Sequence, residues 1–148
     1  MTRDVLISIS GEQMTDGETG DIEMITTGDY FEKNGKHYII YDEITDGIEG
    51  VTRNTIKVLP ERMDIIKRGY GQTQMLFEKN KKHLTCYATP VGDLMIGINT
   101  NQILVEEQED LLRIDVKYSL DINYEHVSEC NIVVAVRPRE HAQLHLYG

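Results

Sequence analysis

Apolar and polar residues alternate with a period of two along most of this chain, from Asp4 to Val136. Successive side chains of a β-strand point to opposite faces, so this period is typical of strands with one buried face. β-Branched and aromatic residues, which favour strands, recur throughout the same region. A helical period is nearly absent, and the pattern therefore predicts an all-β protein.

Turn-forming residues interrupt the alternation at ten places, which implies up to eleven strand segments. The sharpest signal is Asn34-Gly35, because both residues tolerate the positive φ angles of a type I′ hairpin turn. The ten breaks are Gly17 to Gly20, Asn34-Gly35, Asp46 to Gly50, Leu59 to Glu61, Gly69 to Gly71, Asn80 to Lys82, Pro90 to Asp93, Asn99 to Asn101, Glu106 to Asp110 and Asn123 to Ser128.

Connections this short leave no room for crossover helices, so neighbouring segments are expected to pair antiparallel in a meander. An open meander exposes two strand edges, and closure into a barrel removes them. We therefore expect one domain, residues 1–148, that forms a closed antiparallel up-and-down barrel of eight to ten strands. A β-sandwich is the alternative. The interior of such a barrel is filled by side chains or holds one small ligand.

Three segments carry clean apolar stripes and are expected to line the core. These stripes are Met75 and Phe77, then Leu94, Ile96 and Ile98, then Leu112, Ile114, Val116, Tyr118, Leu120 and Ile122. In contrast, residues 37–43, 51–59 and 62–68 mix polar and apolar residues on both faces. We expect Tyr41, Glu43, Thr55, Lys57 and Arg68 to share the inner face, which would place one acid and two bases inside.

Buried charges need partners, so this polar set has three interpretations. It forms a pocket that recognises a ligand, an ion-pair cluster that closes one end of the barrel, or a face that points outward into solvent. The residues alone leave all three open.

Several short strings, taken in order, resemble one known family. They are Gly35-Lys36-His37-Tyr38, Tyr41-Asp42-Glu43, Thr55-Ile56-Lys57, Arg68-Gly69, Phe77-Glu78, Tyr87 to Gly92, Thr100 and Tyr118-Ser119-Leu120. Their order and spacing resemble the YwiB-like family of uncharacterised bacterial barrels of the calycin type. The resemblance runs through nearly the whole chain. It implies a lipocalin-like or fatty-acid-binding-protein-like barrel and assigns no activity, since such barrels host many functions.

The resemblance and the strand faces agree on a set of residues expected to line a ligand pocket. These are Tyr41, Glu43, Thr55, Lys57, Arg68, Thr89 and Tyr118.

Charge narrows the classes of partner. The 148 residues carry a formal net charge of −10, which repels phosphate backbones and anionic lipid headgroups. The one basic cluster lacks interleaved aromatic residues and is expected to be a charged hairpin tip; it contains Lys79, Lys81, Lys82 and His83. The N-terminal residues form neither a signal peptide nor a membrane span. We expect a cytoplasmic protein that binds neither nucleic acid nor membranes.

Motifs for catalysis and metal binding are sparse. The chain has no GxSxG, P-loop, HExxH or GxGxxG motif, so no catalytic residue, metal ligand or cofactor is assigned. Cys86 and Cys130 lie 44 residues apart without CxxC spacing and are expected to be free, buried thiols. His37 and His83, at strand starts, are expected to be exposed.

The C-terminal group Glu140, His141 and His145 would hold a metal only on a helix, which nothing in the pattern indicates. We expect a solvated tail.

Together these features predict a barrel that binds a small, partly apolar molecule whose polar or charged head is held by Arg68, Lys57, Tyr41 and Glu43. One alternative is a structural or protein-interaction barrel with a filled core, which includes a homodimer. Another is an enzyme that acts on a small metabolite. An interior without a cavity above about 300 Å³ would contradict the first hypothesis.

Overall fold

The computed structural model describes residues 3–15, 17–44, 50–69 and 71–139. Ten β-strands make up this part of the chain, which confirms the all-β prediction. They are β1 (Asp4–Thr15), β2 (Glu18–Lys33), β3 (Lys36–Glu43), β4 (Thr52–Leu59), β5 (Arg62–Arg68), β6 (Gln72–Glu78), β7 (Lys82–Thr89), β8 (Gly92–Gln108), β9 (Leu111–Ile122) and β10 (Glu125–Pro138).

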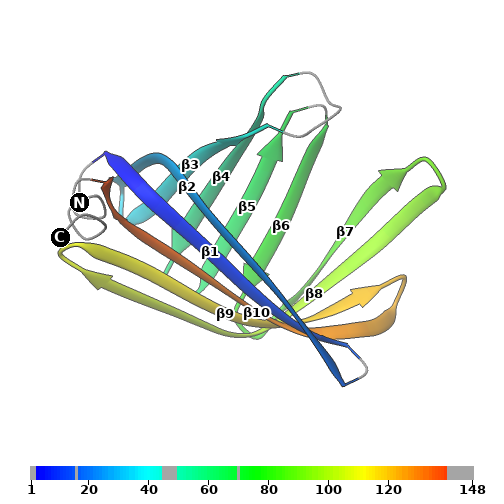
Figure 1. The fold of residues 1–148 in the computed structure, drawn as a ribbon. Helices are drawn as coiled ribbons and strands as arrows, with labels where there is room; N and C mark the ends of the chain where they lie inside the picture. Colours follow the sequence, from blue (N-terminus) through cyan, green and yellow to red (C-terminus); the bar gives the residue numbers. More distant parts are fainter. Residues whose placement is uncertain (1–2, 16, 45–49, 70, 140–148) are drawn as a thin grey trace.

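All ten strands belong to one antiparallel sheet with the order β6-β5-β4-β3-β2-β1-β10-β9-β8-β7 (Figure 1). Strands β1 to β6 pair in chain order, and so do strands β7 to β10; the ladder between β1 and β10 joins these two halves. The sheet curls so that β6 and β7 approach one another, and the protein is a nearly closed up-and-down barrel. The predicted barrel is confirmed, although β6 and β7 form no ladder with each other in the described part of the chain.

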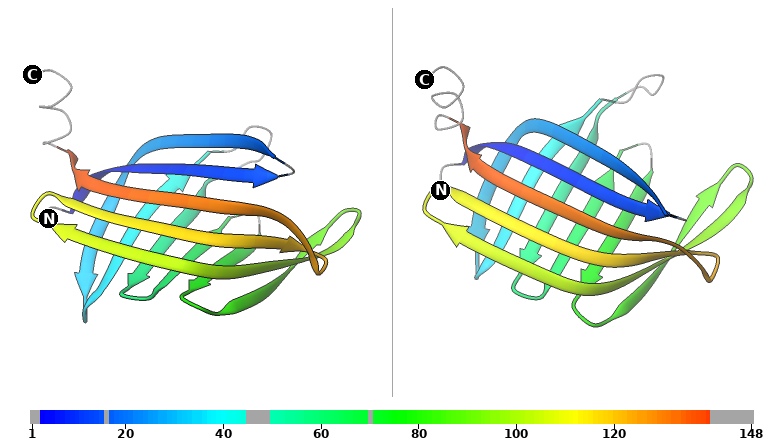
Figure 2. Two further views of the ribbon diagram at one scale, coloured as in Figure 1. Left: turned by 90° about the horizontal axis from the view of Figure 1, so that it is seen from below. Right: turned by 60° about the horizontal axis from the view of Figure 1, so that its bottom comes forward.

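Two groups of strands form the opposite walls of the barrel, and they cross at a steep angle (Figures 1 and 2). One wall contains β8, β9, β10 and β1, and the other contains β3 to β6. The turn after β6 joins the walls, because Asn80 N donates to Thr100 O at 2.9 Å and Thr100 N donates to Lys81 O at 3.2 Å. The β7–β8 hairpin extends beyond this junction.

The core lies between the two walls and is made of alternate residues from both. The apolar stripe of β9 is its centre, since Leu112, Ile114 and Val116 are fully buried. Phe77 from β6 is also fully buried, and its ring meets the ring of Tyr118 edge to face at 4.9 Å. Burial of these side chains supplies most of the driving force for closing the barrel.

Strand β2 bends from one wall into the other. Its first part pairs with β1 and its last residues pair with β3. Gly28 lies at the change of partner, where a Cβ atom would come within 2.7 Å of Ile7 Cδ1 and would overlap the backbone of Ile40. Only glycine fits where the walls come this close.

The ends of the strands coincide with the predicted breaks, with one exception. Asn34 and Gly35 have φ angles of 54° and 75°, as a type I′ turn requires. The break predicted at Asn99 to Asn101 is wrong, because these residues lie within β8. The register shifts there between Thr100 and Gln102, so the polar residues mark a β-bulge that keeps Thr100 buried.

Candidate functional site

The predicted site residues of β3 face the interior. Tyr41 is 6% exposed, and Glu43, two residues later on the same face, is partly buried. Tyr118 also faces the interior, where it contacts Phe77. Thus three of the seven predicted residues face the interior.

The expectation that Thr55 and Lys57 face inward is wrong. Their neighbours Asn54, Ile56 and Val58 are fully buried, and alternate side chains of a strand point to opposite sides. The pairing of β4 with β3 explains why Thr55 and Lys57 face outward, since Ile56 lies opposite the buried Ile39. Lys57 instead places its ammonium group 5.9 Å from the centre of the Tyr38 ring on the outer face.

Arg68 and Thr89 are also outside the interior. Arg68 is exposed at the end of β5, on the face opposite its buried neighbours Met63 and Ile65. Thr89 ends β7, and its hydroxyl donates to Gly92 O within the hairpin turn. The structure therefore does not assemble the predicted set into one pocket.

A different base pairs with Glu43. Lys67 Nζ lies 3.2 Å from Glu43 Oε1, and Asn54 Nδ2 donates to the same oxygen at 2.7 Å. Asn54 is fully buried, and its Oδ1 has no hydrogen-bond partner within the described part of the chain. These three residues, the Glu43 cluster, come from adjacent strands β3, β4 and β5. Of the three interpretations, the closing ion-pair cluster fits Glu43 best.

A cavity of about 380 Å³ lies on the inner face beside Tyr118, where β1, β2 and β10 meet. Its apolar wall contains Ile9, Ile22 and Ile132. The other lining residues are Gly11, Glu12, Gln13, Gly20, Asp21, Tyr118, Cys130 and Asn131. Ile22 is 73% exposed, so the cavity opens to solvent. We call this space the Tyr118 cavity.

Polar groups gather on one side of the Tyr118 cavity. Gln13 Nε2 donates to Ser128 Oγ at 3.0 Å, and Ser128 Oγ lies 3.4 Å from Cys130 Sγ. Burial raises the pKa of Tyr118, and the neighbouring Cys130 raises it further, so the phenol keeps its proton. The cavity thus offers a hydroxyl, an amide and a thiol beside an apolar wall.

A larger hollow, of about 600 Å³, adjoins the Tyr118 cavity. The two spaces share Glu12, Gln13, Tyr118, Cys130 and Asn131. The larger one also includes exposed residues of the outer face, among them Leu104, Lys117 and Glu129, so it extends past the edge of the barrel wall.

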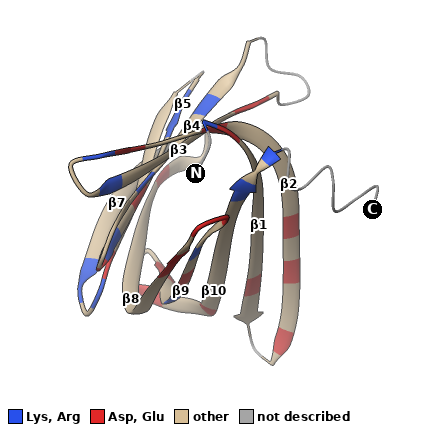
Figure 3. Ribbon diagram, turned by 90° about the vertical axis from the view of Figure 1, so that its left-hand side faces the viewer, with Lys and Arg blue, Asp and Glu red and all other residues tan. Residues whose placement is uncertain are grey.

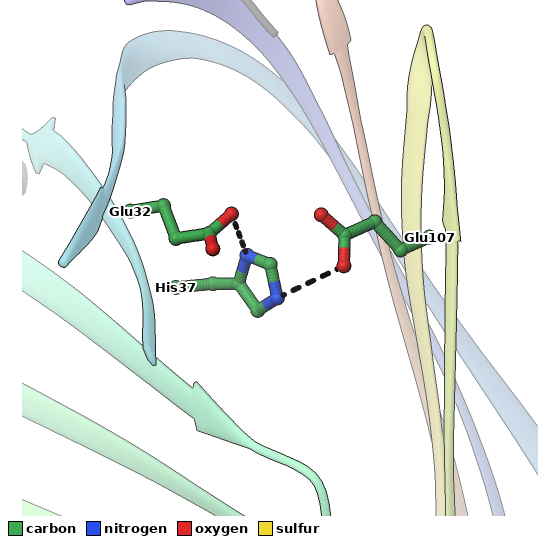
Figure 4. Close-up of side chains that lie close together, drawn as sticks. All are labelled: Glu32, His37 and Glu107. Carbon is green, nitrogen blue, oxygen red and sulfur yellow. Dashed lines mark ion pairs between the residues drawn. The ribbon is translucent and has the colours of Figure 1, made fainter. Parts of the chain in front are cut away.

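A third group of polar residues lies at the far end of β2. His37 is 7% exposed, which contradicts the expected exposure. Tyr30 Oη lies 2.7 Å from His37 Nδ1. Glu107 Oε2 lies 3.6 Å from His37 Nε2, and Glu32 Oε2 lies 3.9 Å from His37 Nδ1 (Figure 4). The sequence contained a signal for this burial, because His37 shares a strand face with Ile39 and Tyr41.

Tyr30 is held in its neutral form at this position. Burial raises its pKa to about 12, and the carboxylates of Glu32 and Glu107 add to the shift. Glu32, His37 and Glu107 each offer one donor atom, and these atoms lie within 4.8 Å of one another. We call them the His37 cluster; it is the arrangement of described side chains most suited to a metal ion.

Two further expectations have mixed outcomes. Both cysteines are free, as predicted, but Cys86 is exposed and Cys130 is partly buried. Cys86 is exposed because it lies on the same face of β7 as the exposed Leu84, whereas Thr85 and Tyr87 on the other face are partly buried. Glu140, His141 and His145 lie outside the described residues. No helix in the described part of the chain is long and apolar enough to cross a membrane.

Comparisons with known proteins agree with the barrel. The chain is 25% identical over 127 residues to the uncharacterized beta-barrel protein YwiB of Bacillus subtilis (strain 168), covering 86% of this chain and 88% of that protein. It also matches the crystal structure of ywiB protein from Bacillus subtilis with a TM-score of 0.77 and 23% identity, covering 92% of each chain. At that identity the structural likeness shows the fold alone.

A family model described as a domain of unknown function, DUF1934, matches residues 7–134. The matched segment runs from β1 to β10 and includes Tyr118, His37 and Glu43. The chain therefore belongs to the DUF1934 family of bacterial β-barrel proteins of unknown function.

Proposed function

We propose that this protein binds a small, partly apolar molecule inside the barrel, in the Tyr118 cavity. The observation that carries the proposal is an interior space of about 380 Å³ with an apolar wall and a few polar groups. Ligand pockets typically have volumes of about 300–1,000 Å³ and this mixed lining. The cavity is therefore large enough for one small molecule. Its volume exceeds about 300 Å³, the lower end for ligand pockets, below which the ligand-binding hypothesis would have been contradicted.

The charges around the cavity favour a neutral head group over the anionic one that Arg68 and Lys57 would have bound. Among the described residues, no lysine or arginine lines it. Glu12 and Asp21 do, but they are exposed and alternate along β1 and β2 with Gln13 and Gly20, which belong to the inner face. Figure 3 shows acidic positions repeated along β2, one of the strands that form this wall. An anion in the cavity would therefore lack a paired base, which is costly in a partly buried site, and the nearby acidic residues would add to that cost. Hydrogen bonds to Tyr118 and Gln13 suit a hydroxyl or amide head.

Gly20 provides a direct test, because a side chain there would occupy the cavity. A Cβ atom at Gly20 would have no heavy atom within 4 Å, and its backbone is outside the left-handed region. Gly20→Leu should therefore fill the space without straining β2. Thr27→Leu adds the same side chain at an exposed position of the same strand and serves as the matched control.

Native mass spectrometry of gently purified protein, compared with the denatured sample, shows whether a ligand is carried. We expect a releasable mass in the wild type and in Thr27→Leu, and a bare chain in Gly20→Leu. Binding of 1-decanol, decanamide and decanoate then tests the head group. The alcohol and the amide should each bind at least about tenfold more tightly than the acid, since one uncompensated charge costs more than 1.4 kcal/mol.

Bare chains in all samples, with no decanol or decanamide binding, would contradict the proposal and favour the alternative of an interaction barrel, whose homodimer the same spectra would show. The enzyme alternative would use the same inner polar set, with Glu43 and Lys57 among its members, to act on a small metabolite. Lys57 lies on the outer face, so that arrangement is not formed.

A further inference from the structure

We infer that the His37 cluster is a binding site for a divalent transition-metal ion, with Zn²⁺ as the best-suited ion. The site is independent of the Tyr118 cavity, because it lies at the opposite end of β2. Its three donors are Glu32 from the end of β2, His37 from the start of β3, and Glu107 from the end of β8.

The spacing of the donor atoms fits a shared ion. Two ligands bonded to one tetrahedral Zn²⁺ at about 2.0–2.2 Å lie roughly 3.3–3.6 Å apart. His37 Nε2 and Glu107 Oε2 are 3.6 Å apart, close to this spacing and too far for a hydrogen bond. Glu32 is half exposed, so its side chain is free to turn and supply the third ligand. The nearby carboxylate of Glu32 already lies within 4.8 Å of the other donors.

Tyr30 holds the imidazole as a metal-bound histidine is usually held. Metal-ligating histidines bind the ion through one ring nitrogen while the other nitrogen is fixed by a hydrogen bond. His37 Nδ1 lies 2.7 Å from Tyr30 Oη, and both residues are buried. If Nδ1–H donates to Tyr30 Oη, Nε2 is left with a free lone pair that faces Glu107.

The two carboxylates beside His37 also favour a bound cation. Glu32 and Glu107 place two carboxylates around one imidazole, and neither forms an ion pair with a lysine or arginine among the described residues. Elsewhere in the described chain, Glu43, Glu78 and Asp121 each have such a partner. Like charges this close repel each other, and a divalent ion would turn the repulsion into attraction.

The chemistry of the donors selects the ion. One imidazole nitrogen with two carboxylates suits Zn²⁺, whereas Ca²⁺ and Mg²⁺ prefer six or more oxygen ligands. Three protein ligands leave one coordination position open. Two of the donors, Glu32 and Glu107, line a hollow of about 350 Å³ together with Arg3, Tyr30, Phe31 and Gln108, so water or an anionic oxygen would have access to an ion held between them.

The test is Zn²⁺ binding to the full chain after treatment with a chelator, measured by competition with a chromophoric chelator. We expect one Zn²⁺ per chain, and at least about 100-fold weaker binding after His37→Gln or Glu107→Gln. Tyr30→Phe, which removes the supporting hydrogen bond, should weaken binding about tenfold. Glu107 is more than half exposed, so Glu107→Gln keeps the test valid if His37→Gln fails to fold.

Two controls separate this site from other histidines. His126→Gln removes an exposed imidazole that lies 3.0 Å from Glu129, and it should leave Zn²⁺ affinity unchanged. The double variant His141→Gln/His145→Gln removes the two imidazoles near the C-terminus and should also bind as the wild type does. Co²⁺ substitution gives a second readout, because its visible spectrum should show tetrahedral nitrogen and oxygen ligation that Glu107→Gln abolishes.

The inference is overturned if the wild type binds no Zn²⁺, or if binding survives in both His37→Gln and Glu107→Gln. Loss of binding in the C-terminal double variant alone would overturn it as well. Arg3→Ala adds one further check. Arg3 borders the same hollow, so removing its charge should strengthen Zn²⁺ binding.

Discussion

The Glu43 cluster and the His37 cluster are both built from polar residues that point into the barrel, yet their charges are balanced differently. Glu43 accepts from Lys67 and from the buried Asn54, so its carboxylate is neutralised by the protein itself. Among the described residues, Glu32 and Glu107 have no lysine or arginine partner and share the imidazole of His37. This comparison indicates that the first cluster is a structural closure and that the second is prepared for an external cation.

The largest effect on stability is expected from a substitution in the Glu43 cluster. Asn54→Asp replaces a fully buried amide that donates to Glu43 with a second carboxylate. Lys67 cannot neutralise both acids, so the variant should lose about 2–4 kcal/mol of unfolding free energy at pH 7. Urea unfolding followed by circular dichroism measures this loss. A change below about 0.5 kcal/mol would show that the cluster tolerates unbalanced charge.

A matched pair of tyrosines tests both regions at high pH. Burial raises the pKa of Tyr30, beside His37, and of Tyr41, beside Glu43, to about 12 in each case. The unfolded chain releases these protons near pH 10, whereas the folded protein holds them until about pH 12. The unfolded state therefore binds fewer protons in this range, and stability falls as the pH rises from 10 to 12.

Each tyrosine should contribute up to about 2–3 kcal/mol to that loss, since one pKa unit corresponds to about 1.4 kcal/mol. Tyr30→Phe and Tyr41→Phe should each flatten the dependence of unfolding free energy on pH by a similar amount. Urea titrations between pH 8 and 12 provide the measurement. A slope in either variant equal to that of the wild type would mean that its phenol ionises freely in the folded protein.

Removing one carboxylate from each cluster should give the smallest changes in stability, but changes of opposite kind. Glu43→Gln removes the partly exposed ion pair with Lys67 and should cost about 0.5–1 kcal/mol. Glu107→Gln, measured in the presence of EDTA, removes one of two like charges and should leave stability unchanged or raise it by a few tenths of a kcal/mol. Thermal unfolding of both variants and of the wild type measures whether each substitution lowers or raises stability. Equal destabilisation by both substitutions would remove the distinction between the clusters.

The strands and their turns could be predicted from the sequence, because both depend on local chemistry. The Asn34-Gly35 turn depends only on the φ angles of these two residues, so it does not depend on where the strands lie in the fold. The prediction of a turn at Asn99 to Asn101 was wrong because it also relied on local chemistry alone. These residues have turn chemistry, but the burial of Thr100 and the pairing of β8 with β9 keep the chain extended.

The candidate sites were less accessible to sequence analysis. Alternation divides a strand into two faces, but it does not say which face is inside when both mix polar and apolar residues. On β4 the residues opposite Ile39 and Tyr41 decide the matter, so Ile56 and Asn54 turn inward and Lys57 turns outward. The cavity at Tyr118 likewise depends on how closely β1, β2 and β10 approach.

The sequence by itself determined an all-β chain, the ends of most strands and the apolar stripe of β9, because each follows from the conformational preferences of neighbouring residues. Only the tertiary structure decided that His37 meets Glu107, seventy residues later in the chain. That contact requires the ladder between β1 and β10, which brings the end of β8 to the start of β3. Distant side chains meet where closure of the barrel places them, and no local pattern records that closure.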